Sequence, residues 1–565
     1  MDEQVFDVVI VGSGGGGLVA ALAAVEAGLK PVLLEKQAVL GGSTGMSGGV
    51  IWMPNNPLMR AEGVPDSFEA GMTYLQAVVG EPDEPSSLAR REAFLTAGPE
   101  MISFIQDQGV RLVRCEGYAD YYDNYVGGNA RGRSVEGVPW DAKQLGDWHG
   151  KIIPGMARRM GLAVKTNEVR DLSMYSQSLR SLLVAARVAV RTYRGRLMRK
   201  DLVTNGESLI SQLTKILLDR NVPIWLDTAV DELVVENGVV VGVRATRDGQ
   251  PITVRGTSGV ILSAGGFEHN TEFRLKVTEA TQPNDGSYSM ANPGNTGEVL
   301  QAAMALGAKV DYMDESVWFL TPRIEMAGST LTVARQYSHT IIVNQQGQRF
   351  VNESNSYLEV GRALYAHDAV PAWLVFDHDY RQSVPWVSGM PKLRQFKTAM
   401  PGRIPQAWLD DGWILQADTL EQLAEKMGVP AASLVQTVER FNAGAVSGKD
   451  PDFGRGESQY NKVLGHPGSK LNPAVGPVAK GPFYATQLFP GDVGTIGGVV
   501  CNDNAQVLGQ DDVPIPGLYA TGNMAATVTG RVYPGAGASI SNTMVFGYLA
   551  AKHAARVARE GHPVR

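Results

Sequence analysis

The residues best suited to chemistry near the start of the chain are a glycine cluster and an acid that follows it. Residues 12–17, GSGGGG, satisfy the pattern GxGxxG and come directly after the apolar run at residues 8–11. Glycines there permit a tight turn, close approach of backbone N–H groups to a pyrophosphate, and close packing of the next helix. Glu35 ends a second apolar run, where a carboxylate can accept hydrogen bonds from an adenosine ribose. Because an acid at that place disfavours a 2′-phosphate, we expect NAD or FAD rather than NADP.

A strand, a helix and a second strand must position these residues. Residues 8–11 have the pattern of a buried strand, we predict a helix over 18–27 that ends at Gly28, and a second parallel strand covers 31–35. The helix N-terminus would face the phosphates, where free N–H groups and the helix dipole favour negative charge. The next loop, GGSTGMSGG at residues 41–49, matches the nucleophile-elbow pattern twice but adjoins the dinucleotide unit. We therefore interpret it as lying along a flavin and its phosphates.

Later segments predict that both ends of the chain build one nucleotide site. Residues 259–266 form an apolar run ending in small residues, and residues 517–523 form another run into a glycine turn. A predicted helix from about 542 to 559 can place its N-terminus at a flavin and stabilise negative charge on the reduced ring. In the middle of the chain, predicted strands and helices no longer alternate. A site assembled from both ends with an insertion between them suits FAD better than NAD.

The predicted fold is α/β, with a Rossmann-like FAD-binding domain and an inserted α+β substrate-capping domain. We place the FAD-binding domain at residues 1–290, with a helical insertion near 170–200, and at residues 495–565. The capping domain is placed at residues 291–494.

Composition and charge narrow the class of protein. The net charge of −7 argues against nucleic-acid binding, which needs a basic surface. The first residues lack the regions of a signal peptide, and no apolar run reaches ~18 residues, so we expect neither a secretory signal nor a membrane-spanning segment. The two cysteines, Cys115 and Cys501, lie far apart and form no CxxC pair, so we expect a reducing cytoplasmic compartment in which both are packing residues. The eight histidines form no HExxH or HxH pattern, and no metal site is predicted.

One predicted helix, near residues 179–200, is basic. Its arginines 180, 187, 191 and 194 follow helical spacing along one face, and leucines lie away from that row. A solvated basic face is the commoner explanation of such a pattern. The alternative is peripheral attachment to an anionic membrane surface.

The sequence motifs resemble those of 3-ketosteroid Δ1-dehydrogenases, within the fumarate reductase and succinate dehydrogenase flavoprotein superfamily. GGSTGMSGG, VILSAGGFEHN, RFVNES, GLYATGN and GRVYPGAG follow the first glycine cluster in the order found in that family. The resemblance covers nearly the whole chain. It implies FAD-dependent 1,2-dehydrogenation of 3-ketosteroids in steroid degradation, with a C2 proton passing to a tyrosine and a C1 hydride to flavin N5. It also implies an external electron acceptor of the quinone type.

The resemblance assigns roles to four residues. Tyr357 would be the base and Tyr121 its hydrogen-bonded helper, while the Tyr533 hydroxyl and the Gly537 N–H would hold the C3 carbonyl oxygen. Two such donors act as an oxyanion hole, and a tyrosine with an ordinary pKa near ~10 needs its phenolate stabilised to act as a base. The expected substrate-pocket residues are Trp52, Tyr118 and Phe319. The residues expected to bind FAD are Gly12, Ser13, Gly14, Gly15, Gly17, Glu35, Lys36, Gly42, Ser43, Thr44, Ser47, Gly48, Gly49, Val230, Ala264, Gly265, Gly522, Asn523 and Ile540.

Two positions depart from the family pattern, and other functions stay open. Ile496 stands where lysine is common and is expected to alter a surface or loop contact, while Ala536 stands where proline is frequent and is expected to loosen the turn that aims Gly537. The alternatives are 3-ketosteroid Δ4-(5α)-dehydrogenation, fumarate-type reduction, and a non-catalytic flavoprotein or steroid-binding module. A small dicarboxylate would need converging arginines, whereas the C-terminal motif offers a tyrosine and glycine N–H groups.

Overall fold

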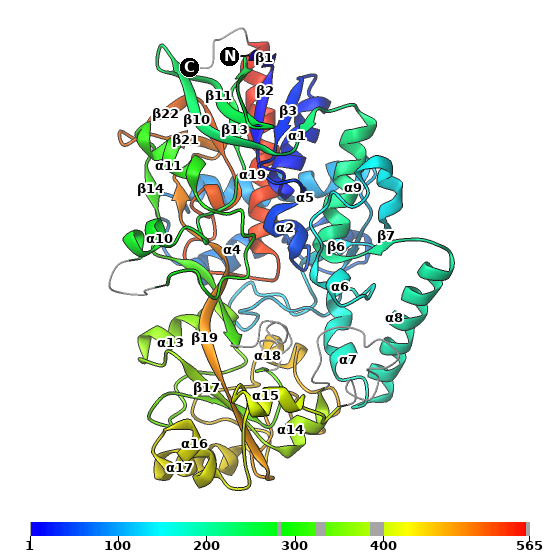
Figure 1. Ribbon diagram of the computed structural model, residues 1–565, viewed down its shortest axis with the longest axis vertical. Helices are drawn as coiled ribbons and strands as arrows, with labels where there is room; N and C mark the ends of the chain where they lie inside the picture. The colour runs from blue at the N-terminus through cyan, green and yellow to red at the C-terminus, as the bar shows by residue number, and fades with distance from the viewer. Residues whose placement is uncertain (1, 279–283, 323–334, 385–400, 561–565) are drawn as a thin grey trace.

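The chain forms two lobes, each built around its own sheet (Figure 1). The computed structural model describes residues 2–278, 284–322, 335–384 and 401–560. The first and last described elements, β1 (Asp2–Phe6) and α19 (Ala538–Arg559), lie in the upper lobe, and strand β19 (Phe483–Thr495) runs from the lower lobe back towards it. We refer to these as the upper and lower lobes below.

The upper lobe contains a six-stranded sheet whose inner strands are parallel. Its strands, in spatial order, are β21 (Gln506–Leu508), β22 (Pro514–Ala520), β13 (Val260–Leu262), β2 (Val8–Val11), β3 (Pro31–Leu34) and β9 (Ile224–Trp225). Only the edge strand β21 pairs antiparallel among them. All four residues of β2 are apolar and buried, as expected for a strand covered on both faces.

Alternate residues of β2 enter two different cores, because successive side chains of a strand point to opposite faces. Val8 and Ile10 pack with α1 (Gly15–Glu26) and α19 (Ala538–Arg559), which lie side by side on one face. Val9 and Val11 pack on the other face with a four-stranded sheet. The strands of that sheet are β1 (Asp2–Phe6), β12 (Gln250–Gly256), β11 (Val239–Arg247) and β10 (Thr228–Glu236).

Smaller elements complete the upper lobe. A three-stranded sheet carries Trp52 and is formed by β4 (Val50–Trp52), β6 (Ser134–Gly137) and β5 (Leu112–Arg114). Two strand pairs are β7 (Trp140–Asp141) with β8 (Leu202–Val203) and β14 (Val310–Asp311) with β20 (Gly498–Val499). Its helices are α2 (Gly42–Met46), α3 (Pro57–Ala61), α4 (Phe68–Val79), α5 (Leu88–Asp107), α9 (Asn205–Asp219), α10 (Thr271–Val277) and α11 (Glu298–Ala305). Helices α6 (Met156–Arg159), α7 (Val169–Ser173) and α8 (Leu179–Leu197) stand at the side of the molecule around a small apolar core of their own (Figure 1).

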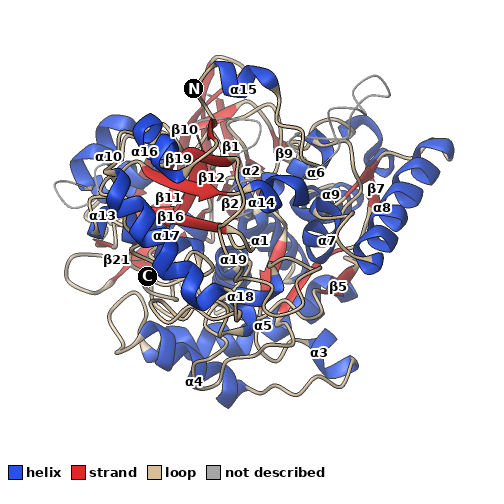
Figure 2. Cartoon of the chain, turned by 90° about the horizontal axis from the view of Figure 1, so that it is seen from below, coloured by secondary structure: helices blue, strands red, loops and turns tan. Residues whose placement is uncertain are grey.

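The lower lobe is an antiparallel sheet with helices around it, as the view from below shows (Figure 2). Its strands are β15 (Ser316–Pro322), β19, β17 (Ala372–Phe376) and β16 (Thr340–Val343), and β18 (Leu415–Ala417) also pairs with β19. Its helices are α13 (Tyr357–Ala366), α14 (His378–Ser383), α15 (Gln406–Asp410), α16 (Leu420–Met427), α17 (Ala431–Ala445) and α18 (Gln459–Val463). Separate apolar cores fill the two faces of the sheet.

The predicted α/β fold is confirmed, with boundaries that shift where glycines are involved. Helix α1 begins at Gly15, three residues earlier than predicted, because the cluster glycines themselves form its first turn. Helix α19 begins at Ala538 rather than near 542, directly after Gly537 at φ +92°. The predicted domain limits stay a prediction; α11 packs against β10 and β20 of the upper lobe.

The structure also bears on the two cysteines, on Ile496 and on the search for membrane-spanning helices. Cys115 and Cys501 are both buried free thiols, as expected for packing residues. Ile496 is buried, so the expectation of a surface contact is wrong, and an effect on a loop contact stays a prediction. Within the described residues, every helix is too short or too polar to cross a membrane.

Candidate active site

The glycine cluster forms a cradle in which a side chain has no room. A Cβ on Gly12, at φ +100°, would lie 2.2 Å from the Ser263 carbonyl oxygen, and one on Gly17 would lie 2.0 Å from the Gly12 oxygen. Gly14 caps α1 without a side-chain hydrogen bond, while the Gly15 N–H donates to Thr44 Oγ1 at 3.2 Å. The first turn of α1 thus offers backbone N–H groups to an anion, which suits a pyrophosphate.

Glu35 lies at the carboxyl end of β3, beside the end of β2. Its Oε2 accepts hydrogen bonds from the Ser13 N–H at 3.1 Å and the Ser13 hydroxyl at 2.5 Å, and its Oε1 accepts one from Gln37 N–H at 2.9 Å. Burial raises the pKa of Glu35, while the hydrogen bonds from Ser13 and Gln37 lower it. Lys36 turns away to Thr296 and Glu298, with Nζ–oxygen distances of 2.6 and 3.2 Å.

The other predicted FAD residues gather at the same edge of the sheet. Strands β2, β13 and β22 run parallel in one register, with Val260 between Val9 and Leu518. Their carboxyl ends therefore meet, which brings the cluster glycines beside Gly265 and Gly522, at φ +82° and +69°. One loop packs at the start of α1 and α9 and carries six of these residues: Gly42, Ser43, Thr44, Ser47, Gly48 and Gly49. Val230 lies on β10, and Ala264 follows β13. Asn523 follows Gly522, and Ile540 lies in the first turn of α19.

Two buried oxygens at this edge have no hydrogen-bond partner among the described residues. They are Glu268 Oε2 and Thr495 Oγ1, and Asn523 Nδ2 donates to the other Glu268 oxygen at 3.3 Å. Buried polar atoms are rarely left unsatisfied, so a ligand fits at this place. The glycine cradle, the acid at β3 and these oxygens suit a dinucleotide that stretches along the sheet edge.

Three tyrosines from distant parts of the chain meet next to this edge. The ring centroids of Tyr121 and Tyr357 lie 5.4 Å apart, those of Tyr357 and Tyr533 5.6 Å, and those of Tyr121 and Tyr533 5.8 Å. Phe319 on β15 lies 5.2 Å from Tyr357. Tyr121 is held in place by its N–H, which donates to the Pro534 oxygen at 3.0 Å.

The segment before α19 supplies two hydrogen-bond donors. The Tyr533 hydroxyl shares a hydrogen bond of 3.0 Å with Ser539, and the Gly537 N–H makes no hydrogen bond to another described residue. A Cβ on Gly537 would lie 2.0 Å from the Val50 oxygen, which requires glycine here. Tyr533 and Ser539 line the same small cavity as Thr495, Gly522 and Asn523, so the donors adjoin the sheet edge.

Trp52 and Tyr118, both expected in the substrate pocket, differ in surroundings. Trp52 is fully buried; its Nε1 donates to Asp120 Oδ1 at 2.8 Å, and a Cβ on Gly535 would lie 2.3 Å from its ring. It therefore supports the loop of Tyr533 and Gly537 from behind. Tyr118 is half-buried beside Tyr121. Their contact with a substrate stays a prediction.

Burial has the largest effect on the pKa values of the tyrosines at this site. It raises the pKa of Tyr357 and of Tyr121 well above 10, and the hydrogen bond from Tyr121 lowers that of Tyr357 by less. The pKa of Tyr460 is raised by burial only to about 12, because Arg335 and Gln336 act against it. Tyr460, Arg335 and Ser539 were missed by the sequence reasoning; only Ser539, two residues after Gly537, lies inside a motif region.

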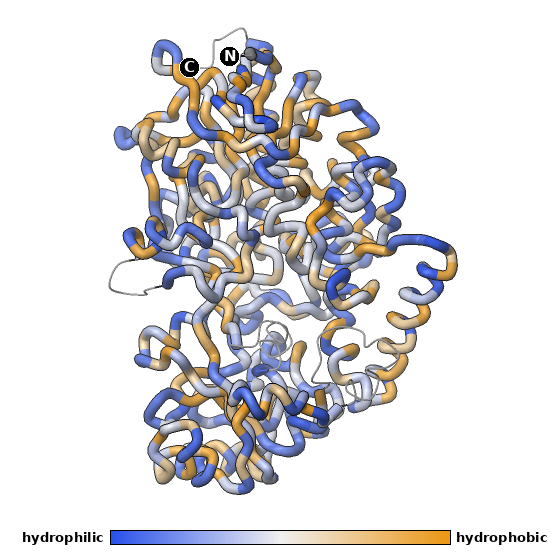
Figure 3. Tube along the Cα trace, viewed as in Figure 1, coloured by the Kyte–Doolittle hydropathy of each residue, from blue (hydrophilic) through white to orange (hydrophobic). Residues whose placement is uncertain are grey.

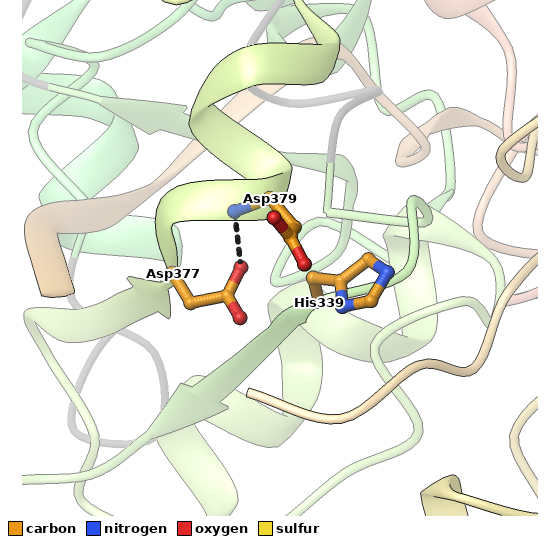
Figure 4. Close-up of side chains that lie close together, drawn as sticks. All are labelled: His339, Asp377 and Asp379. Atoms are coloured by element: carbon orange, nitrogen blue, oxygen red, sulfur yellow. Dashed lines mark hydrogen bonds between the residues drawn. The ribbon is translucent and has the colours of Figure 1, made fainter. Parts of the chain in front are cut away.

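A histidine and two aspartates of the lower lobe lie close enough together to suggest a metal site (Figure 4). Asp377 Oδ1 accepts hydrogen bonds from the N–H groups of Asp379 and Tyr380 at the start of α14, at 3.0 and 3.1 Å. Asp379 pairs with Lys480 at 2.9 Å, and the His339 ring bonds the Pro477 oxygen at 2.7 Å. Each group therefore has a structural role in the protein.

Comparison with known proteins identifies the family. The family described as FAD binding domain matches residues 7–540. The 3-oxosteroid 1-dehydrogenase of Mycobacterium tuberculosis is 41% identical, over 98% of this chain and 99% of its own. The chain belongs to the 3-oxosteroid 1-dehydrogenase family. Its cofactor is FAD, and the prediction of an FAD-dependent oxidoreductase is confirmed.

Two further proteins are similar to this chain over nearly its whole length. A crystal structure of the 3-ketosteroid Δ1-dehydrogenase of Sterolibacterium denitrificans, in complex with 1,4-androstadiene-3,17-dione, superposes with a TM-score of 0.88 at 34% identity. It covers 98% of this chain and 100% of its own. A 4-oxocyclohex-2-ene-1-carboxylate 5-dehydrogenase of Sinomonas cyclohexanicum is 32% identical, over 98% of this chain and 94% of its own.

Proposed function

We propose that this protein catalyses the FAD-dependent 1,2-dehydrogenation of 3-ketosteroids. The convergence of Tyr121, Tyr357, Tyr533 and Gly537 beside the FAD-binding edge carries the proposal, since these are the residue types that the reaction needs. The 41% identity to a 3-oxosteroid 1-dehydrogenase along almost the whole chain supports it.

In the proposed reaction the chain itself supplies proton transfer and charge stabilisation. The Tyr533 hydroxyl and the Gly537 N–H bind the C3 carbonyl oxygen and stabilise the negative charge that develops there. Tyr357 takes the C2 proton, with Tyr121 hydrogen-bonded to it. When bound, FAD supplies the acceptor for the C1 hydride. The buried tyrosines and Phe319 exclude water from the reacting carbons.

Anaerobic mixing of the purified holoenzyme with a 3-ketosteroid tests this function. We expect the flavin absorbance to bleach, and product analysis to place the new double bond between C1 and C2. A saturated 5α-3-ketosteroid separates this reaction from Δ4-(5α)-dehydrogenation, which would place the bond between C4 and C5. Tight steroid binding without bleaching would instead assign a non-catalytic steroid-binding flavoprotein. After bleaching, a soluble quinone analogue should restore the absorbance if the proposed quinone-type acceptor is correct.

We also propose that α8 attaches the protein to an anionic membrane surface. Helix α8 stands at the edge of the molecule, with apolar residues along its length (Figures 1 and 3). Leu179 and Leu197 are 74% and 86% exposed, and Leu182, Leu183, Val190 and Tyr193 are also exposed. The exposed basic residues on and after the helix are Arg180, Arg187, Arg194, Arg196, Arg199 and Lys200. Exposed apolar side chains together with cations favour an interfacial helix over a simply solvated one.

Sedimentation with lipid vesicles tests the attachment. We expect the protein to pellet with vesicles rich in phosphatidylserine at low salt, and to stay in solution with phosphatidylcholine alone. Leu182→Ser with Leu183→Ser should weaken binding, whereas Leu471→Ser, which changes a leucine that is 70% exposed in the lower lobe, should not. Equal binding to both kinds of vesicle, or to neither, argues against the proposal.

A further inference from the structure

Helix α4 supports both of the upper-lobe segments that carry proposed active-site groups. The first is the tyrosine loop, residues 115–133, which contains Tyr121; the second is the donor segment, residues 529–537, which contains the two proposed carbonyl donors. A Cβ on Gly127, at φ +80°, would lie 2.6 Å from the Ala70 carbonyl oxygen of α4, and one on Gly530 would lie 2.8 Å from the Val79 side chain. Both segments therefore pack on the same helix.

Tyr74 of α4 hydrogen-bonds to both segments. Its side chain is fully buried, and its hydroxyl donates to the Pro534 carbonyl oxygen at 2.7 Å. The same Pro534 oxygen accepts a hydrogen bond from the Tyr121 N–H at 3.0 Å. The Tyr74 oxygen in turn accepts one from the Tyr122 N–H at 3.3 Å. One buried hydroxyl thus joins the donor segment to the tyrosine loop.

Trp52 makes a second connection between the same two segments. Its Nε1 donates to Asp120 Oδ1 at 2.8 Å, and a Cβ on Gly535 would lie 2.3 Å from its ring. The ring centroids of Trp52 and Tyr74 lie 6.0 Å apart, so the two supporting side chains pack together. Asp120 and Gly535 are next in sequence to the residues that Tyr74 joins. Both connections therefore act at the same place in each segment.

Asp120 is itself fixed by buried ion pairs. Its Oδ2 accepts from Arg133 at 2.8 Å and from the Asn129 N–H at 3.0 Å, and Arg133 pairs with Asp66 at 2.7 Å. The Arg133 guanidinium carbon also lies 5.2 Å from the centroid of the Tyr74 ring. Because breaking a buried ion pair is costly, this network holds the tyrosine loop in one conformation. The donor segment is thus attached to a fixed structure.

The Pro534 peptide unit lies between the two proposed carbonyl donors. Tyr533 precedes it, and Gly537 follows three residues later. A carbonyl oxygen that accepts two hydrogen bonds fixes the plane of its peptide unit, and with it the direction in which the chain leaves on either side. An oxyanion hole is effective only when its donors already point to the place where negative charge develops.

We propose that Tyr74, with Trp52 beside it, is a positioning residue of the reaction: its hydroxyl fixes the Pro534 peptide unit against the tyrosine loop and so aims the two proposed donors at the C3 oxygen. This inference rests on the proposed dehydrogenase function. Both hydrogen bonds of the Tyr74 hydroxyl go to backbone groups, so it acts through the donor segment. It therefore favours removal of the C2 proton, during which charge develops on the C3 oxygen, over binding of the neutral ketone.

The test compares the wild-type holoenzyme with Tyr74→Phe, Tyr533→Phe and the double variant. Tyr74→Phe removes the hydroxyl and keeps the ring that packs against Trp52. Tyr519→Phe is the matched control, since Tyr519 is another fully buried tyrosine of the upper lobe, whose hydroxyl shares a hydrogen bond of 3.0 Å with His553. The control reports the general effect of removing a buried hydroxyl.

Three measurements separate positioning from binding. Loss of deuterium from C2 of 2-deuterated 4-androstene-3,17-dione, with the flavin already reduced, follows proton transfer without hydride transfer. The Kd of 4-androstene-3,17-dione reports binding of the neutral ketone. The Kd of estradiol reports binding of a charged oxygen, because its ionised phenolic A ring presents at C3 an oxygen that resembles that of the enolate.

We expect Tyr74→Phe to slow deuterium loss by roughly 10- to 100-fold, because donors displaced by up to about 1 Å lose that much. Estradiol binding should weaken, whereas the Kd of 4-androstene-3,17-dione and the FAD content should stay close to those of the wild type. The same substitution should have a smaller effect in the Tyr533→Phe background, where one of the aimed donors is already absent. Tyr519→Phe should match the wild type in all three measurements.

Unchanged deuterium loss and estradiol binding in Tyr74→Phe would overturn the positioning role and leave the dehydrogenase function intact. Equal weakening of both steroids, or full additivity with Tyr533→Phe, would also overturn it, since either result indicates a general structural role. If Tyr74→Phe does not fold, Trp52→Phe must show slower deuterium loss and weaker estradiol binding at an unchanged ketone Kd, and any other pattern overturns the proposal. A wild-type enzyme that neither bleaches nor exchanges C2 deuterium with any 3-ketosteroid overturns the proposed function itself.

Discussion

The ring of Tyr357, at the start of α13 in the lower lobe, lies 5.6 Å from the ring of Tyr533, in the upper-lobe segment before α19. The two lobes therefore bring the proposed base and the proposed carbonyl donor together. Neither lobe alone contains both groups. We expect any change that separates the lobes to abolish activity without preventing FAD binding, because the FAD-binding edge belongs to the upper lobe.

Tyr357→Phe should leave FAD bound and reduce turnover by roughly 10² to 10⁴, the usual contribution of a general base. The substitution removes one oxygen and keeps the ring that packs against Phe319 and Tyr121. The flavin spectrum reports FAD content, and anaerobic bleaching reports the chemical step. Wild-type turnover in this variant would refute Tyr357 as the base.

Tyr533→Phe should lower turnover by about 10² to 10³, as for the loss of one oxyanion-hole donor. Ser539→Ala should have a smaller effect, since Ser539 orients the Tyr533 hydroxyl through the 3.0 Å hydrogen bond but does not bind the carbonyl. Bleaching rates at saturating steroid compare the two variants. If Ser539→Ala proves the more damaging, the serine rather than the tyrosine is the donor.

The elements with strong local patterns were predictable, and the contacts between distant segments were not. The apolar run of β2 and the glycines after it specify the first strand and turn, because only glycine fits the 2.0 and 2.2 Å approaches there. Tyr121, Tyr357 and Tyr533 could be singled out only through motif resemblance. Tyr460 and Arg335 stand in segments without a recognisable motif, and only the folding of the lower lobe brings them near Tyr121. Trp52 is apolar and near the first motifs, yet its full burial depends on Gly535 far along the chain.

Gly17→Ala should yield protein with little bound FAD. The added Cβ would meet the Gly12 carbonyl oxygen at 2.0 Å, so the turn between β2 and α1 must shift away from the phosphate position. Gly28→Asn is the matched control, since Gly28 lies at φ +88° after α1 with nothing within 4 Å of a Cβ, and asparagine tolerates that conformation. The ratio of flavin to protein absorbance measures the effect. Equal flavin content in both variants would contradict the role of the glycine cluster in binding the FAD phosphates.

Glu353 should make the lower lobe sensitive to acid. Burial raises its pKa, but Arg349 and Arg455 lower it more, and the pKa falls from 4.5 to about 2. Because the folded-state value lies below the unfolded one, this group stabilises the protein by about 3 kcal/mol above pH ~4.5, and the contribution is lost as pH falls towards 2. Glu353→Gln should destabilise the protein by roughly 3 to 5 kcal/mol at neutral pH, because buried Arg455 loses the carboxylate with which it forms its ion pair and Arg349 keeps only Asp450. Urea unfolding at pH 7 and pH 3, followed by tryptophan fluorescence, measures both effects: the gap between wild type and Glu353→Gln should narrow at the lower pH, and a gap that stays constant would rule out ionised Glu353 as its source.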